Sequence, residues 1–333
     1  MKKICNDPQR YVDEMLDGLC AAHPRHYQRL GDSGRVLTHL PQQGDPKVAI
    51  VTGGGSGHLP LFHGYVGAGL VDACAIGNVF AGPRVADCLT AMQASHHDAG
   101  VLQLYGNYGG DRMNFEMAAE MAELEGMEVA QVRMTDDVAS APQQEAHKRR
   151  GVAGLVYAYK MAGAKAAAGA SLAEVTATAQ KTVSAVRSIG VALSPCIVPE
   201  SGTPAFTLDD SEIAFGMGIH GEPGIWRGEM RSAEALTHEM LDRLLEEVPA
   251  GRGERVSVMV NSLGATPLEE LYIIYRSVAQ RMADRQVSLM EPLIGRYATS
   301  MEMSGFSLSL CALDNELETL LRAPASSPFW SQP

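Results

Sequence analysis

Positive charge is scarce in this sequence. Its 27 Lys and Arg residues stand against 39 Asp and Glu residues, which gives a formal net charge of −12. A surface of that sign repels nucleic acids and anionic membranes on average. The expected partners are therefore small molecules or other proteins, with no nucleic acid and no membrane among them.

Closely spaced cysteines are also lacking. The chain has six cysteines in 333 residues, with no Cys-x-x-Cys pair and no zinc-type spacing among them. Such scattered cysteines are typical of reduced core residues in a cytoplasmic protein, and the sequence indicates no metal site. The cysteines are Cys5, Cys20, Cys74, Cys88, Cys196 and Cys311.

Long apolar runs are missing as well. The first eight residues, Met-Lys-Lys-Ile-Cys-Asn-Asp-Pro, reach polar residues and a proline before any apolar stretch of signal-peptide length. The longest Ala-rich stretch, residues 152–168, is interrupted by Lys160 and Lys165. No run is long enough to span a membrane, and we expect a cytoplasmic protein.

What the sequence does contain is a large apolar fraction in alternating strand and helix patterns. With 46% hydrophobic residues in 333, the chain is long enough for two domains. Strands alternating with helices predict two α/β domains, each with a parallel or mixed sheet flanked by helices. We place an N-terminal domain at residues 1–187 and a C-terminal domain at 188–333. The predicted strands are residues 47–52, 72–76, 101–104, 128–134, 212–215 and 255–260, with a new run starting near 190.

Helix-start signals mark several of the predicted helices. Asp7 followed by Pro8 predicts an N-cap and a first helical residue near the start of the chain. Ser171 and Glu174 have the spacing of a capping box, in the second of two helical patterns that precede the predicted domain boundary. The tail after Leu321 is rich in proline and is expected to be irregular and packed on a domain surface.

A glycine-rich segment, Gly53-Gly54-Gly55-Ser56-Gly57-His58, follows the strand predicted at 47–52. A dinucleotide fingerprint starting at Gly53 and a serine-hydrolase turn around Ser56 both require glycine where His58 stands, and the chain lacks the Gly-x-x-x-x-Gly-Lys-Ser/Thr phosphate loop. What remains is a sharp turn that brings backbone N–H groups and one imidazole to the carboxyl end of a strand, where ligands of such sheets bind. The alternative is a tight strand-to-helix turn without a function.

Two further stretches carry reactive side chains. Asp111 follows the strand predicted at 101–104, and a carboxylate there is either a helix N-cap or an acceptor of a proton from a substrate hydroxyl. His220 lies in the loop Gly-Met-Gly-Ile-His-Gly-Glu-Pro-Gly, whose four glycines and proline exclude a helix interior; its alternative is a solvated loop histidine. Together His58, Asp111 and His220 provide one potential nucleophile and two potential bases or hydrogen-bond partners.

These motifs resemble the substrate-binding subunit of dihydroxyacetone kinase, the DhaK family. The resemblance runs in order along the whole chain and implies two α/β domains in a homodimer. It implies that His220 adds covalently to the substrate's ketone carbonyl as a hemiaminal, while His58 and Asp111 hold the terminal hydroxyl and help remove its proton. Substrate contacts are also implied for Gly55, Ser56, Gly57 and Gly106. The resemblance is carried by residues 48–60, 106–116, 217–224 and 261–269.

The resemblance further implies that the phosphate comes from another chain. Phosphoryl transfer needs a nucleotide, magnesium and a cradle for them, and this chain has no recognisable cradle. No cofactor is expected on this chain; ATP or ADP with Mg²⁺ is expected on a separate helical nucleotide-binding subunit, alone or with a phosphotransferase-system protein as donor. The chain alone is predicted to bind ketose without phosphorylating it. The alternatives are a non-catalytic ketose-binding regulator and a lone oxidoreductase, which the failed dinucleotide motif disfavours.

Three positions depart from the family pattern. Leu59 stands where many members have glutamate, Asn78 where an acidic residue is usual, and Gly106 where lysine or another larger residue is often found. Small residues at Gly106 and Gly109 predict a larger pocket. A four-carbon ketose such as erythrulose is therefore an alternative substrate to dihydroxyacetone.

Overall fold

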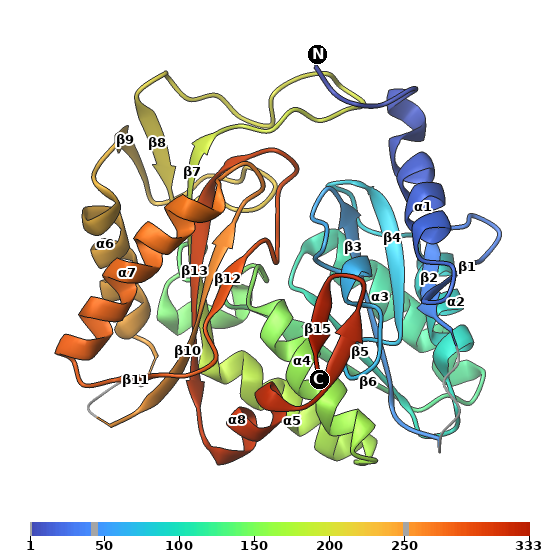
Figure 1. Ribbon diagram of the computed structural model, residues 1–333. Helices are drawn as coiled ribbons and strands as arrows, with labels where there is room; N and C mark the ends of the chain where they lie inside the picture. The colour runs from blue at the N-terminus through green and yellow to red at the C-terminus, as the bar shows by residue number, and fades with distance from the viewer. Residues whose placement is uncertain (1, 41–45, 249–252) are drawn as a thin grey trace.

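The computed structural model describes residues 2–40, 46–248 and 253–333. Within these ranges the N-terminal part of the chain forms a six-stranded sheet and the C-terminal part a seven-stranded sheet. Figure 1 shows the two sheets side by side, with helices α4 (Leu155–Ala167) and α5 (Leu172–Ala185) between them in the lower part of the view. Both sheets are mixed and both are flanked by helices, so the predicted fold class is confirmed.

The first sheet has the order β1-β2-β4-β3-β5-β6. Strands β3 to β6 run parallel to one another. Strand β2 pairs antiparallel with β4, and β1 pairs antiparallel with β2. Because β3 pairs with β4 on one side and β5 on the other, the strand order reverses at β3, and ligands of such sheets bind outside the carboxyl ends at this point. The strands are β1 (Tyr27–Leu30), β2 (Val36–His39), β3 (Ala49–Ser56), β4 (Ala73–Val79), β5 (Val101–Gly106) and β6 (Val129–Met134).

The glycine-rich segment is mostly strand. The strand predicted at 47–52 continues to Ser56, so the prediction of a turn beginning at Gly53 was wrong. Gly53 pairs with Ala75 of β4, and a Cβ on it would lie 2.6 Å from the Ala75 carbonyl oxygen. The glycines here allow close packing within the sheet, and the chain changes direction only at Gly57, whose φ is +99°.

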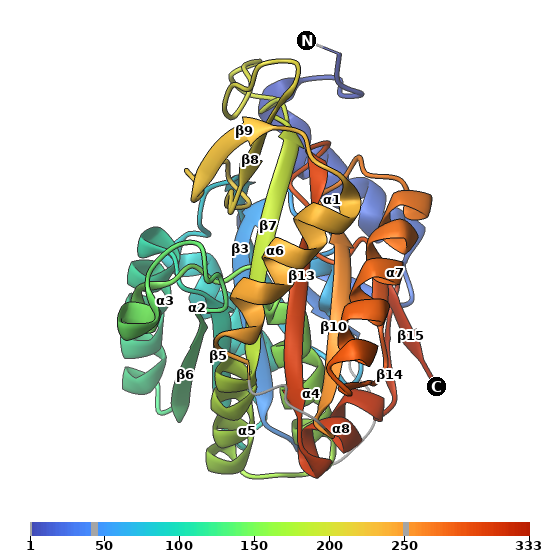
Figure 2. The ribbon, with the colours of Figure 1, turned by 90° about the vertical axis from the view of Figure 1, so that its left-hand side faces the viewer.

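The second sheet has the order β11-β10-β13-β7-β8-β9, and β12 also pairs with β10. Most pairs are antiparallel, with β11 and β12 parallel to β10. Figure 2 shows helices α6 (Ala233–Leu245) and α7 (Leu268–Asp284) lying across one face of this sheet, where their apolar sides pack on it. The strands are β7 (Val186–Ser194), β8 (Glu212–Phe215), β9 (Trp226–Glu229), β10 (Arg255–Ser262), β11 (Ser288–Leu289), β12 (Leu293–Gly295) and β13 (Ser304–Leu313).

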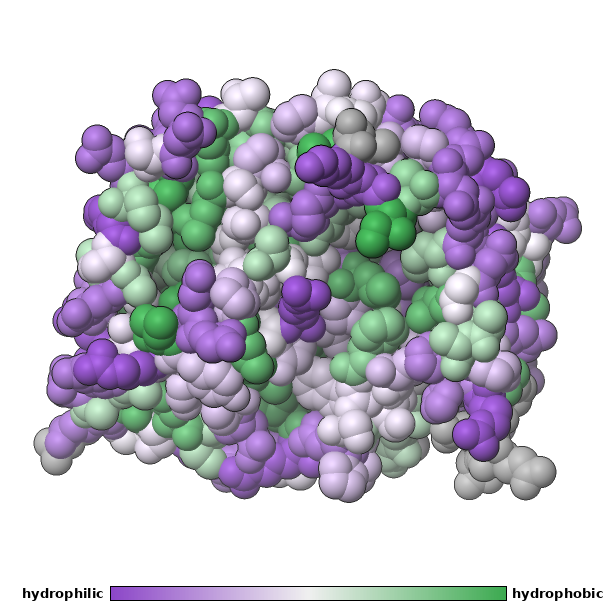
Figure 3. Space-filling view, turned by 45° about the horizontal axis from the view of Figure 1, so that its top comes forward, coloured by the Kyte–Doolittle hydropathy of each residue, from purple (hydrophilic) through white to green (hydrophobic). Residues whose placement is uncertain are grey.

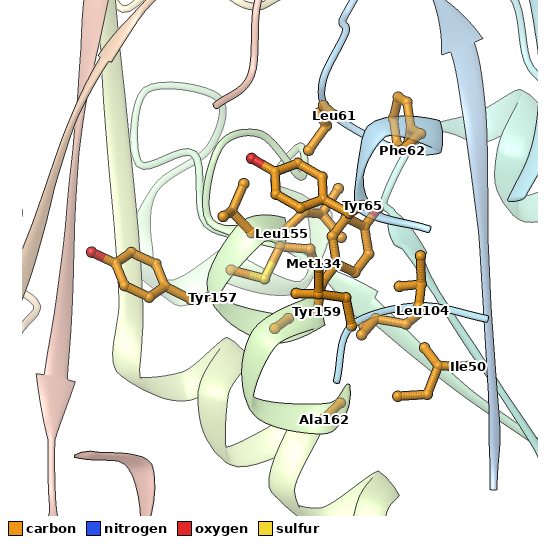
Figure 4. Packing of buried hydrophobic residues seen from close by; sticks show 14 of the residues in the cluster. Ile50, Leu61, Phe62, Tyr65, Leu104, Met134, Leu155, Tyr157, Tyr159 and Ala162 are labelled. Atoms are coloured by element: carbon orange, nitrogen blue, oxygen red, sulfur yellow. The ribbon is translucent and has the colours of Figure 1, made fainter. Parts of the chain in front are cut away.

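Helix α4 connects the two sheets. Nearly all of its residues are buried, as expected of a helix with apolar neighbours on every side. The Tyr159 hydroxyl hydrogen-bonds Thr52 of β3 at 2.6 Å, and the Tyr157 hydroxyl hydrogen-bonds Ser257 of β10 at 2.9 Å. Figure 4 shows Tyr157 projecting from α4 away from the other labelled side chains. The helix therefore fixes the spacing between the sheets and between the loops that each sheet carries.

The predicted capping signals are present. Asp7 accepts a hydrogen bond from the Gln9 N–H at 2.9 Å at the start of a short 3₁₀ helix (Pro8–Arg10), which leads into α1 (Tyr11–Ala22). Ser171 and Glu174 make both hydrogen bonds of a capping box on α5.

Helices α2 (Val85–Ser95) and α3 (Gly109–Leu124) cover the face of the first sheet that is opposite to α4. In the described ranges, no helix combines the length and apolar character that crossing a membrane requires.

The C-terminal tail differs from the prediction. After α8 (Asn315–Arg322), strands β14 (Ala325–Ser327) and β15 (Trp330–Gln332) form an antiparallel hairpin instead of an irregular tail. The Ser327 hydroxyl donates to the Gly64 carbonyl at 2.8 Å, and the Trp330 ring lies 6.2 Å from that of Tyr65. These contacts with the N-terminal half order the tail, which Figure 1 shows in front of the first sheet.

The predicted domain boundary between residues 187 and 188 falls inside β7. One apolar cluster contains side chains of α4 together with side chains from both sheets. The two sheets therefore share part of their core, and the division into domains at this position stays a prediction.

Candidate active site

Loops from both sheets meet at the carboxyl end of β3. His58 follows β3, Asp111 lies in the first turn of α3 after β5, and His220 lies in the loop after β8. The ring centroids of His58 and His220 are 4.8 Å apart, and the charge of His220 acts on Asp111. Figure 3 brings this end forward and shows apolar patches interspersed with hydrophilic side chains, which are most frequent at the margins of the face. His58 and His220 are therefore neighbours, and Asp111 lies close enough to His220 to interact with it electrostatically.

His58 is completely buried and held by the opposite half of the chain. Its Nδ1 lies 2.7 Å from the carbonyl oxygen of Thr299, so Nδ1 carries the proton that it donates. Its Nε2 has no hydrogen-bond partner in the described part of the molecule. Burial, reinforced by the repulsion that His220 exerts when its ring is protonated, lowers the pKa of His58 to about 3. The ring is therefore neutral at physiological pH, with Nε2 available only as an acceptor.

Aromatic rings enclose the two histidines. Phe80 stacks on His58 with 5.0 Å between ring centroids and meets His220 at 5.4 Å. Tyr108 lies edge-on to His220 at 4.8 Å, and burial raises the pKa of its hydroxyl well above the usual value. These rings fix the planes of both imidazoles and exclude water from one side of the site.

The His220 loop has the tight turns that its glycines predict. Gly216 and Gly221 have φ values of +79° and +86°. Glu222 closes the loop: its Oε1 lies 2.9 Å from His220 Nδ1, and its Oε2 accepts from the His220 backbone N–H at 2.9 Å. Burial opposes ionisation of Glu222, but the contact with His220 and the charge of Arg150 outweigh it and lower its pKa to about 2. The His220 side chain is 22% exposed, so the loop is held and remains accessible.

Asp111 is a buried carboxyl group, and none of the described residues places a counter-charge in contact with it. It is 7% exposed, and its Oδ1 finds no hydrogen-bond partner among the described residues. Burial raises its pKa to about 7, partly offset by the charge of His220. The N-cap residue of α3 is Tyr108, and Asp111 makes no capping hydrogen bond with the described residues. The alternative prediction, that Asp111 is a helix N-cap, was therefore wrong. A Cβ on Gly82 would lie 2.5 Å from Oδ1, which means that glycine there permits the close approach.

The other predicted contact residues lie around these three. Ser56 is buried, and its hydroxyl donates to the Gly77 carbonyl at 2.9 Å. The carbonyl oxygen of Gly57 accepts a backbone hydrogen bond of 2.7 Å from the loop before β13. Gly55 is tightly packed, because a Cβ on it would lie 2.7 Å from a backbone nitrogen of the loop after β4. Their contact with substrate stays a prediction, as does that of Gly106. Within the described ranges, no group of three or more His, Cys, Asp or Glu side chains is placed to hold a metal ion.

The positions that depart from the family pattern have different surroundings. A Cβ on Gly106 would lie 3.2 Å from both the Gly151 carbonyl oxygen and the Tyr108 ring, so the space left by the missing side chain is occupied by Tyr108. A Cβ on Gly109 would meet no atom within 4 Å. Asn78 is exposed and lines a cleft of about 390 Å³ beside Gly82. Of the two glycines, only Gly109 faces open space. Leu59 is partly buried next to His58.

Three residues that shape the site were not assigned a role from the sequence. Glu222 stands in the His220 loop. A carboxylate two residues after a histidine in a tight turn is a sequence signal that could have predicted its contact with the imidazole. Phe80 and Thr299 lie 22 and 241 residues from His58 in the sequence, and only the folded chain brings them to it. No local pattern could have identified them.

Comparison with known proteins gives a consistent assignment. The model of the Dak1 domain matches residues 17–329. The dihydroxyacetone-binding subunit DhaK of the PTS-dependent dihydroxyacetone kinase 2 of Listeria innocua is 41% identical over 330 residues, which cover 99% of each chain. The D-erythrulose kinase of Mycolicibacterium smegmatis is 39% identical over all of this chain, which spans 57% of that relative.

A solved structure extends the comparison to the fold. The dihydroxyacetone kinase operon co-activator DhaQ superposes with a TM-score of 0.87 at 31% identity, covering 96% of this chain and 98% of that chain. The match therefore extends over both sheets. On the family match and these identities over nearly its full length, the chain belongs to the Dak1 domain family.

Proposed function

We propose that this chain is the ketose-binding subunit of a dihydroxyacetone-type kinase, a phosphotransferase that is inactive without its partner subunit. The observation that carries the proposal is the contact between His58 and His220, with ring centroids 4.8 Å apart, together with a buried Asp111 carboxyl that interacts electrostatically with His220. One nucleophilic nitrogen, one hydrogen-bond acceptor and one proton acceptor suit a small ketone that also bears a hydroxyl group. The name of the L. innocua relative, a dihydroxyacetone-binding subunit, supports the same substrate class.

In this proposal His220 binds the ketose covalently. Its Nε2 lone pair forms a bond to the ketone carbon, and the carbonyl π pair moves to the oxygen, which takes a proton from solvent and becomes a hydroxyl. The resulting hemiaminal holds the terminal hydroxyl in one position. Glycerol has no carbonyl group and cannot form the adduct, so covalent binding discriminates more strongly than hydrogen bonding alone.

His58 and Asp111 take different parts in the transfer. His58, with a pKa of about 3, is too weak a base to remove a proton, and its unpaired Nε2 accepts a hydrogen bond from the terminal hydroxyl. Asp111, with a pKa of about 7, is matched to accept the hydroxyl proton near neutral pH as the oxygen attacks phosphorus. This assigns proton transfer to the carboxylate and orientation to the imidazole.

The phosphoryl group is proposed to come from a nucleotide with Mg²⁺ on a helical partner subunit. That group supplies the phosphate and neutralises its charge, and the residues of this chain hold and deprotonate the acceptor hydroxyl. The L. innocua relative is named PTS-dependent, which favours a phosphotransferase-system protein as the original donor. We also expect the subunit to be a cytoplasmic homodimer, as the family resemblance implies.

Two alternatives have specific support. DhaQ is named a co-activator, which supports a non-catalytic ketose-binding regulator. The M. smegmatis relative is named a D-erythrulose kinase, which supports a four-carbon ketose as substrate. Asp111 favours a kinase over a regulator, because sensing a ketose requires the covalent histidine but no proton acceptor.

Mass spectrometry of the purified chain tests the proposal. With dihydroxyacetone or erythrulose we expect a mass increase on the peptide that contains His220, and none with glycerol or in His220→Ala. Absence of an adduct with both ketoses would overturn the proposal. With the nucleotide-loaded partner, a kinase loses activity in both His220→Ala and Asp111→Ala, whereas a regulator loses its response only in the former. Turnover with ATP by this chain alone would contradict the requirement for a partner.

A further inference from the structure

The Glu222 carboxylate contacts both the ring and the backbone of His220. One oxygen lies 2.9 Å from Nδ1 and the other accepts the His220 N–H at 2.9 Å. Because a carboxylate can only accept hydrogen bonds, the proton of the neutral imidazole must sit on Nδ1. The lone pair is then on Nε2, the nitrogen on the side of the ring away from Glu222.

Glu222 is in turn held by a group from the N-terminal half of the chain. Arg150 Nη1 lies 3.8 Å from Glu222 Oε2, and another Arg150 nitrogen approaches the Gly216 carbonyl at 3.5 Å. Asp137 fixes the guanidinium with contacts of 2.9 Å to Nε and 2.8 Å to Nη2. Arg150 and Asp137 are 13% and 4% exposed, so solvent screens this chain of charges only partly.

Glycine at position 218 is a requirement of this arrangement. A Cβ there would overlap the Glu222 carboxylate and lie 2.6 Å from Arg150 Nη1. The Gly218 N–H also donates to the Glu222 backbone carbonyl at 3.1 Å. The loop therefore folds back on itself so that the carboxylate, the guanidinium and the imidazole can lie in line.

We propose that Glu222 is a positioning residue that holds His220 in the Nδ1–H tautomer, and that Arg150, anchored by Asp137, keeps the Glu222 carboxylate in place. The consequence for ketose binding rests on the proposed function. When Nε2 forms its bond to the ketone carbon and the oxygen takes a proton from solvent, the ring keeps its Nδ1 proton and carries a positive charge. Glu222 then faces an imidazolium and stabilises the adduct more than the free ring.

The tautomer can be measured without any ketose. Ring ¹⁵N chemical shifts of histidine distinguish a protonated from an unprotonated nitrogen, and comparison with His220→Gln assigns the resonances. We expect the wild-type chain to show His220 with Nδ1 protonated and Nε2 free. In Glu222→Ala the Nε2–H form should become the major one. His58, whose Nδ1 is held by the Thr299 carbonyl, should not change and is the internal control.

Glu222→Gln keeps the size of the side chain and decides the question if the alanine variant does not fold. Its single carbonyl oxygen can accept from Nδ1 or from the backbone N–H, but not from both with the original geometry, so we expect a mixture of tautomers. An unchanged tautomer in the folded variants would overturn the proposal. Arg150→Met should produce a smaller shift in the same direction, because the contact that it removes is longer.

Adduct formation provides the second measurement. We expect Glu222→Ala and Glu222→Gln to weaken ketose binding roughly tenfold to a hundredfold, by analogy with carboxylates that orient a metal-binding histidine. If the wild-type chain forms no adduct, the proposed function fails while the tautomer result still stands. If the adduct forms equally well in all folded variants although the tautomer shifts, the inferred role in ketose binding is wrong.

Discussion

Replacing Asp111 with asparagine is expected to stabilise the fold at alkaline pH while removing the proposed proton acceptor. Burial raises the pKa of Asp111 from 3.8 to about 7. Below pH 3.8 the carboxyl is protonated in the folded and the unfolded chain, and it has no effect. Between the two pKa values only the unfolded chain releases the proton, so stability falls as pH rises, and above about pH 7 the loss is complete.

The magnitude follows from the two pKa values. One pKa unit corresponds to about 1.4 kcal/mol, so the ionised carboxyl destabilises the fold by about 4 kcal/mol at pH 8 and by about 2 kcal/mol at pH 5. Asparagine has nearly the same shape and no charge to lose. Its amide would lie against Gly82 without an acceptor there, and that cost is the same at both pH values. The robust quantity is therefore the change of about 2 kcal/mol in the stability difference between pH 5 and pH 8.

Urea unfolding of the wild-type chain and Asp111→Asn at these two pH values measures that change. Asp72→Asn is the control with the opposite sign. Burial opposes ionisation of Asp72, but the hydrogen bond from His39 and the charge of Lys47 hold its pKa below the usual value, so its loss should destabilise the fold at both pH values. A stability difference for Asp111→Asn that does not depend on pH would refute the reasoning.

Three further predictions concern packing, charge and rate. Gly54→Ala should lower the free energy of unfolding by about 1–3 kcal/mol, measured by thermal unfolding, because the added Cβ overlaps the Phe62 ring. Glu247→Gln should cost about 3 kcal/mol in urea unfolding, because Arg149, which is 1% exposed, loses the charge that it contacts at 2.6 and 2.7 Å. With the partner present, the phosphoryl-transfer rate should rise with pH through about 7 as Asp111 loses its proton, and a flat profile from pH 5.5 to 8.5 would contradict its role as base.

The sequence predicted correctly the strands and helix ends that depend on residues close together in the chain. The strand predicted at 212–215 matches β8, and the capping box on α5 has both of its hydrogen bonds. Strand β13 was missed although its serines alternate with Phe306, Leu308 and Leu310, which is a strand period. Strands β1 and β2 have four residues each, and the pairing of β2 with β4 depends on residues that are distant in the chain. The end of β3 was misplaced because its glycines were interpreted by their freedom to turn, whereas they serve close packing.

The candidate site also has features that the sequence predicts and features that only the folded chain reveals. His58, Asp111 and His220 stand in motifs, so their neighbourhood could be predicted from the sequence. Their protonation could not, because it follows from burial and from groups that the fold supplies. The pKa of His58 falls to about 3 because the ring is enclosed, and that of Asp111 rises to about 7 for the same reason. The sequence therefore suggested one potential nucleophile and two potential bases or hydrogen-bond partners. The structure separates the last two, because the His58 ring is neutral at physiological pH and Asp111 has a pKa of about 7.

Each histidine of the site depends on a group from the other half of the chain, His58 directly and His220 through Glu222. His58 follows a strand of the first sheet, and its Nδ1 donates to Thr299, which precedes β13 of the second. His220 belongs to the second sheet, and its partner Glu222 faces Arg150, which follows β6 of the first. Neither half therefore sets the geometry of its own imidazole alone. The distance between the two rings depends on α4, whose tyrosines hydrogen-bond to both sheets, so a shift of one sheet against the other would misalign both histidines at once.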